Sequence, residues 1–132
     1  MGRDEQIKYW INSAEEDWLV AEDLIKLKRF LHALFLFHLV LEKLLKANWI
    51  HDNFGDTPPF THNLEHIYSK TNVELSASHI DFLRSLNAWN IEGRYPDYQN
   101  KVQKIATEEY TLSKYEIVKT IRQCLLERLL RK

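Results

Sequence analysis

The first part of the chain carries apolar side chains at the spacing of an amphipathic helix. Between about residue 4 and residue 27, apolar positions recur every three or four residues, and most charged side chains fall between them. These apolar positions are Ile7, Trp10 or Ile11, Ala14, Trp18, Ala21 and Leu24 or Ile25. The pattern predicts one long helix with a single buried face.

The next segment, from about residue 30 to residue 52, is apolar around most of a helix circumference. A helix of this kind must be covered on more than one side. We expect partner helices of the same chain and a second copy of the protein to cover it together.

Three further helices are predicted downstream, separated by the few glycines and prolines of the chain. They cover residues 63–70, residues 77–89 and a segment beginning near Thr107, whose hydroxyl can cap the amides of the first turn. The expected cap of the middle helix is Ser76 or Ser78. The predicted buried stripe of the last helix is Leu112, Tyr115, Val118, Ile121, Leu125 and Leu129.

The predicted fold class is all-α, because no segment alternates as a strand does. The architecture should be an up-and-down bundle of four or five helices, forming a homodimer. A chain of 132 residues is long enough for one domain with a real core and too short for two. We therefore expect a single domain spanning residues 1–132.

Charge and composition narrow the classes of function. Lys and Arg number 18 against 19 Asp and Glu, so no overall field draws the whole molecule onto nucleic acid or membrane, and phosphate binding must be local. The single cysteine and the lack of a signal sequence or membrane span predict a cytoplasmic protein. No phosphate loop, Cys-x-x-Cys or HExxH motif occurs, so we expect no cofactor.

Two histidines in THNLEH raise the question of a metal site. His62 and His66 are four residues apart, so on a helix they would share a face and could hold two corners of a metal site. A helix start capped by Thr61 or Asn63, with His62 at the mouth of the loop, explains them more simply. We expect no metal.

A second polar group interrupts the most apolar helix. His38 and Glu42 are four residues apart, and Lys43 and Lys46 follow them. Because an unpaired buried charge is costly, these residues either form a satisfied network with lysine stems reaching the surface, or line the polar wall of a ligand groove.

The segment NIEGRYPDYQN, residues 90–100, collects most of the remaining helix breakers. Gly93 is expected to let the chain leave the preceding helix, so that Arg94 is held on a stiffened turn. The planar fork of an arginine suits phosphate, and Tyr95 offers a ring for stacking. The alternative is an ion pair between Arg94 and Asp97 that only clamps the turn.

Four motifs, in this order, resemble the HEPN domain family. They are YWINSAEEDWLVAEDL near the start, FHLVLEKLLKA in the second helix, THNL after the proline loop and RYPDY after the fourth helix. The resemblance runs from about residue 5 to residue 128. It implies a helical bundle that usually dimerises, with a groove lined by polar residues of the second and fourth helices and the following loop.

The resemblance also implies two kinds of function. Many members act with a minimal nucleotidyltransferase, often as the toxin of a toxin–antitoxin pair, and others are metal-independent ribonucleases. In the ribonucleases an arginine and a histidine, separated by four to six residues, form the active site, and the histidine is the base on the ribose 2′-hydroxyl. After Arg94 those positions hold Gln99, Asn100 and Lys101, so the expected histidine is missing.

The RYPD motif is more similar to the nucleotide-binding, nucleotidyltransferase-associated branch. That branch implies phosphate contacts from Arg94, Lys43 and Lys46 and hydrogen bonds from Asn87 or Asn90. The candidate ligand-binding set is Arg94, Tyr95, Asp97, Asn87, Asn90, His38, Glu42, Lys43, Lys46 and His62.

Three hypotheses remain at this point. The leading one is a nucleotide- or RNA-binding module with a nucleotidyltransferase partner. The second is an enzyme, a metal-independent ribonuclease toxin with Arg94 as its catalytic candidate. The third is a purely structural dimerisation bundle.

Overall fold

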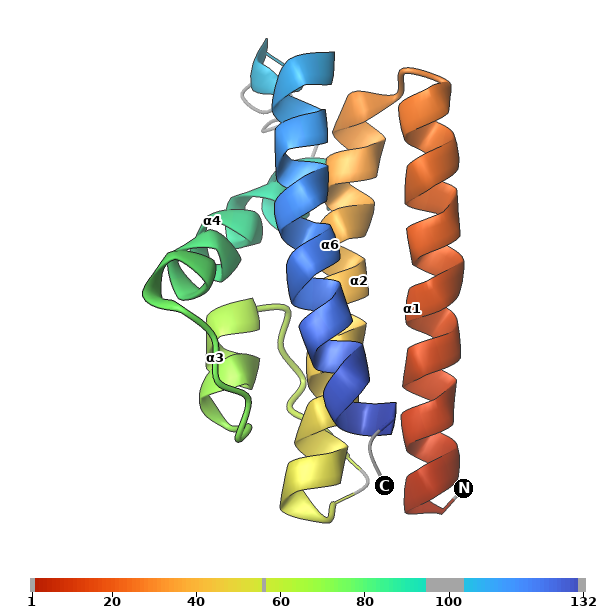
Figure 1. Cartoon of the computed structure of the whole chain (residues 1–132), viewed down its shortest axis with the longest axis vertical. Helices are drawn as coiled ribbons and strands as arrows, with labels where there is room; N and C mark the ends of the chain where they lie inside the picture. The colour runs from red at the N-terminus through yellow and green to blue at the C-terminus, as the bar shows by residue number, and fades with distance from the viewer. Residues whose placement is uncertain (1, 56, 95–103, 131–132) are drawn as a thin grey trace.

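The computed structural model describes residues 2–55, 57–94 and 104–130, with residues 88–94 described by their helical backbone alone. In these ranges there is no strand, and the helices with described bounds are α1 (Arg3–Lys26), α2 (Phe30–Asn53), α3 (Leu64–Ser69), α4 (Ala77–Arg94) and α6 (Glu108–Leu130). The long helices α1, α2 and α6 stand side by side, while α3 and α4 pack on another flank of α2 (Figure 1). The predicted all-α bundle is confirmed.

Helix α2 forms the centre of the bundle. It contacts α1, α3, α4 and α6, so its neighbours within one chain surround it. Its completely buried side chains include Leu34, Phe37, Val40, Leu41, Leu45 and Ile50. The broad apolar circumference of this helix is thus explained without a second copy of the protein. None of the described helices combines the length and apolar character needed to cross a membrane.

An aromatic cluster joins the three long helices. The ring of Trp18 in α1 stacks on the ring of Tyr115 in α6, with centroids 5.0 Å apart, and Phe37 of α2 packs against both rings. The Tyr115 hydroxyl donates a hydrogen bond to Glu22 at 2.6 Å. Burial, and then the hydrogen bond to the negatively charged Glu22, raise the pKa of Tyr115 to about 12.

Side-chain caps fix the starts of three helices. The side-chain oxygens of Asn63, Ser76 and Thr107 each accept a hydrogen bond from the backbone amide three residues later, at 3.1, 3.2 and 3.1 Å. The predicted caps at Ser76 and Thr107 are confirmed, and Asn63 rather than Thr61 caps α3. Each cap satisfies an amide that has no partner within its helix.

The sequence-based prediction was wrong at the end of α4. This helix continues to Arg94 instead of ending near residue 89, so Gly93 lies inside it and Arg94 is a helical residue rather than part of a stiffened turn. A glycine costs a helix only about 1 kcal/mol. A residue that precedes a proline is disfavoured from helical conformation, which the prediction took to act earlier in the chain than it does.

The predicted stripe of α6 was also wrong at its first position. Leu112 is 41% exposed, while Thr111 is completely buried. Both residues lie at helical spacing from Tyr115, which follows Thr111 by four positions and Leu112 by three, but only Thr111 also lies seven positions before Val118. The preference for the more apolar side chain selected the wrong one. Confirmed members of the stripe are the fully buried Val118, Ile121 and Leu125.

Candidate functional site

The polar residues of α2 converge on the carboxylate of Glu42. This carboxylate is buried, and its Oε1 accepts a hydrogen bond from Nδ1 of His62 at 2.8 Å. The Nζ of Lys46, one turn later, donates to Oε2 at 3.3 Å, and Nδ1 of His38, one turn earlier, lies 3.7 Å from Oε1. Glu42 therefore binds the α2–α3 loop to the middle of α2.

The backbone of this loop is anchored at the same residue. The completely buried His38 donates from Nε2 to the carbonyl oxygen of His62 at 2.9 Å. His62 is thus held by both its backbone and its ring. Because a carboxylate only accepts hydrogen bonds, the neutral ring of His62 carries its proton on Nδ1 and keeps an acceptor at Nε2.

His62 is half exposed, whereas the residues grouped around it are buried. The His62 side chain is 53% exposed, and its ring makes no other polar contact with the described residues. His38, Glu42 and Lys46 are buried, with residue exposures of 0%, 5% and 8%. The geometry matches the predicted satisfied polar network, in which Glu42 and Lys46 balance each other's charge. His62 is thus the exposed member of this group.

Lys43 belongs to a different part of the bundle. Its Nζ lies 2.7 Å from Oδ2 of Asp17 and donates to the hydroxyl of Ser13 at 2.7 Å, both on α1. The structure therefore separates Lys43 from the group around Glu42, although the two residues are adjacent in the sequence.

Asn87 connects α4 to the same loop. Its Oδ1 accepts a hydrogen bond from the amide of Leu64 at 3.1 Å, and its Nδ2 donates to Oδ1 of Asn63 at 3.3 Å. Both ends of the side-chain amide are occupied, so Asn87 holds α4 against the start of α3. The structure thus brings Asn87 to the end of the loop that carries His62, in a fastening role.

The remaining candidates lie near or beyond the end of α4. Arg94 is the last residue of this helix, seven residues after Asn87 and so roughly 10 Å further along its axis. The side chains of Asn90 and Arg94, and the whole of Tyr95 and Asp97, lie outside the described residues.

The histidine pair of the THNLEH segment does not share a helix. Because α3 begins at Leu64, His62 precedes the helix and turns toward Glu42, whereas His66 is part of α3. In the described parts of the chain, no three His, Cys, Asp or Glu side chains gather as a metal site would require.

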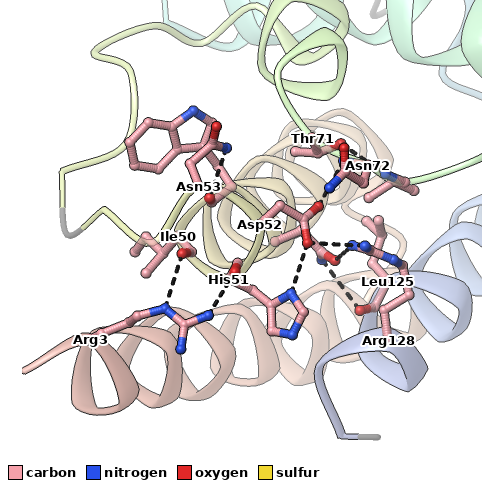
Figure 2. A network of polar contacts seen from close by, with 12 residues as sticks. Arg3, Ile50, His51, Asp52, Asn53, Thr71, Asn72, Leu125 and Arg128 are labelled. Carbon is pink, nitrogen blue, oxygen red and sulfur yellow. Dashed lines mark hydrogen bonds and ion pairs between the residues drawn. The ribbon is translucent and has the colours of Figure 1, made fainter.

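A second polar network, which the sequence did not suggest, surrounds Asp52 at the end of α2 (Figure 2). One of its oxygens, Oδ1, accepts hydrogen bonds from His51 at 2.8 Å and from Arg128 of α6 at 3.0 Å, while Oδ2 accepts from the amide of Asn72 at 2.7 Å. Burial alone would raise the pKa of Asp52, but the hydrogen bonds from Arg128, His51 and Asn72 and the charge of Arg128 outweigh it. The pKa of Asp52 is held below its usual range.

Arg3 completes this network from the start of α1. It donates to the carbonyl oxygens of Ile50 at 3.4 Å and His51 at 2.6 Å, two carbonyls that the last turn of a helix leaves without partners (Figure 2). The network ties the ends of three helices together. Its partners are too distant in sequence for any local motif to reveal it.

Comparisons with known proteins give a family and a similar fold. The family model described as HEPN domain matches residues 7–129. The fold is similar to the crystal structure of TT1696 from Thermus thermophilus, with a TM-score of 0.77 and 17% sequence identity over 96% of this chain and 98% of that chain. A search of the curated proteins found no match.

Proposed function

The chain belongs to the HEPN domain family, and from this we propose that it is a cytoplasmic, dimeric module that binds a nucleotide or an RNA phosphate. We propose further that it acts with a minimal nucleotidyltransferase, in the manner of a toxin–antitoxin pair. The observation that supports the binding role is the half-exposed His62 ring, held in one orientation by the buried Glu42.

Two groups would supply the local positive charge that phosphate needs. His62 donates from both ring nitrogens when protonated, and the guanidinium of Arg94 donates a fork of two parallel hydrogen bonds. The α2–α3 loop and α4 are fastened to each other through Asn87, so their mutual arrangement is set before a ligand binds. The buried pair of Glu42 and Lys46 adds no net charge.

The binding role is tested by titrating the purified protein with nucleoside triphosphates and with short RNA. Arg94→Ala should weaken binding about tenfold or more, since a charge-assisted hydrogen bond to phosphate is lost. Arg84→Ala is the matched control, because Arg84 also lies on α4 but is engaged by Glu65 and Asp81. If neither ligand binds at millimolar concentration, this role is wrong.

The partner is tested separately by coexpressing the chain with the product of the neighbouring reading frame. A nucleotidyltransferase that copurifies with the chain, and reverses any growth defect caused by the chain alone, supports the proposal. A neighbour of another kind that fails to copurify contradicts it. Sedimentation of the purified chain tests the dimer independently.

The orientation of His62 favours metal-independent RNA cleavage as a second candidate function. Nε2 of His62 would take the proton of a ribose 2′-hydroxyl, whose oxygen attacks the adjacent phosphorus. The 5′-oxygen leaves with a proton from water, giving a 2′,3′-cyclic phosphate, while Arg94 stabilises the phosphate charge. Glu42 orients the ring as the carboxylate of a catalytic triad does.

Cleavage in the presence of a chelator, lost in both His62→Gln and Arg94→Ala, would support the enzyme. Cleavage that survives either substitution excludes the mechanism. A third result would favour the purely structural role: Arg94→Ala lowers the melting temperature and changes neither ligand affinity nor RNA cleavage.

A further inference from the structure

The most exposed aromatic side chain of the described residues lies two positions before His62. Phe60 is 97% exposed, and its ring makes no aromatic or cation contact with them. Phe54, in the same loop, is 80% exposed, but the guanidinium of Arg3 lies 4.7 Å from its ring centre. Phe60 is therefore the aromatic ring whose two faces are both open.

The backbone around Phe60 is held by two prolines and a hydrogen bond. Pro58 and Pro59 fix the backbone torsion on its N-terminal side. The amide of Thr61 donates to the carbonyl oxygen of Pro59 at 3.0 Å, which closes a three-residue turn with Phe60 at its apex. The turn fixes the backbone at Phe60, from which the ring extends into the solvent.

The C-terminal side of the turn is anchored as well. His62 is fixed through its carbonyl oxygen to His38 and through its ring to Glu42. The amide of Asn63 donates to the hydroxyl of Thr61 at 3.1 Å. Phe60 and His62 thus lie two positions apart on one hydrogen-bonded segment.

We propose that this segment recognises single-stranded RNA, with a nucleobase stacked on Phe60 and the adjoining ribose phosphate at His62. The inference rests on the proposed binding function and names its ligand class. Residues two apart lie within roughly 7 Å along the chain, a reach that one nucleotide spans between its base and its phosphate. An open aromatic face beside groups that bind the phosphate backbone is the arrangement by which single strands are bound without regard to sequence.

Stacking also explains why a single strand is preferred to a free nucleotide or a duplex. Base-paired strands keep both faces of their bases covered, so they cannot stack on Phe60. The backbone of residues 59–63 is already held by hydrogen bonds, so ordering it adds little cost to binding. A mononucleotide offers one base and one phosphate, whereas a strand continues from His62 toward the end of α4.

The test measures fluorescence anisotropy of labelled oligo(U) and oligo(A) RNA with the full chain. Phe60→Ala and Phe60→Leu should weaken binding at least about fivefold, and Phe60→Trp should preserve it, because only an aromatic ring stacks. Phe54→Ala is the matched control and should leave the dissociation constant unchanged. The same RNA annealed to its complement should bind more weakly than the single strand.

The possible outcomes separate this inference from the binding role itself. One outcome is that single strands bind, and that Arg94→Ala weakens this binding whereas Phe60→Ala does not. The inference is then wrong, while the binding role stands. If Phe60→Leu binds RNA as the unaltered chain does, the ring does not stack on a base and the inference is wrong. If the unaltered chain binds neither RNA nor nucleotides, both proposals fail.

Discussion

The ring of His62 is bonded through Nδ1 to Oε1 of Glu42, a residue buried in the middle of a helix 20 positions earlier in the chain. This bond makes the position of an exposed loop depend on a charge inside the bundle. The buried carboxylate also pairs with Lys46, so one group supports both the loop and the charge balance of α2.

Glu42→Gln should lower the free energy of unfolding by about 3 kcal/mol, because Lys46 is left buried without its counter-charge. The amide oxygen can still accept from His62, so the loss reports the charge rather than the hydrogen bond. Urea denaturation measures it. The double variant Glu42→Gln, Lys46→Met should recover most of the loss, and a double variant as unstable as the single one would contradict this account.

Asp52→Asn should lower stability at neutral pH by about 1.5 to 3 kcal/mol, because the hydrogen bond that Asp52 accepts from Arg128 loses the negative charge of its acceptor. The pKa of Asp52 is depressed in the folded state, so its contribution is present above the ordinary value of 3.8 and is lost as the pH falls through the folded pKa. Denaturation across that range should show the two proteins converging in acid. A constant difference in stability would exclude the ionised Asp52 as its source.

Tyr115→Phe should cost about 1 kcal/mol at neutral pH, since the hydrogen bond to Glu22 is lost while the ring still stacks on Trp18. The pKa of Tyr115 is raised to about 12, so its stabilising effect is complete below the ordinary value of 10.0 and disappears as the pH rises toward 12. Ultraviolet titration should show one late-ionising tyrosine that is absent from the variant.

Gly55→Ala should destabilise the protein by about 1 to 3 kcal/mol. A Cβ atom at Gly55 would lie 2.9 Å from Cη2 of Trp49, on a rigid ring that cannot bend away. The control is Gly2→Ala, whose new Cβ would meet no atom within 4 Å. If both variants have the same melting temperature as the unaltered protein, the loop shifts without cost and this prediction is wrong.

Local patterns predicted the helices and their caps well, because spacing and capping act over a few residues. The buried positions Trp18 and Leu125 followed from periodicity, and the cap at Thr107 followed from its hydroxyl. Thr111 and Leu112 both fit the spacing to Tyr115, and the prediction took the more apolar leucine, although the seven-residue spacing to Val118 favours Thr111.

The candidate site was predicted less completely, because its bonds join distant segments. The spacing of His38 and Glu42 marked a polar group, but nothing local indicated that His62 would complete it. The cluster at Asp52 gave no signal at all, since Arg128 lies 76 residues away in the chain.

The central position of α2 also shapes how the molecule opens. Among the described helices, α3 and α4 contact each other and α2 but make no extensive contact with α1 or α6. Amide hydrogen exchange should therefore resolve two cooperative units, with α3 and α4 exchanging through a partial opening that leaves the three long helices protected. That opening would break the hydrogen bond between His62 and Glu42. The rate at which this bond breaks would then be set by local unfolding rather than by unfolding of the whole chain.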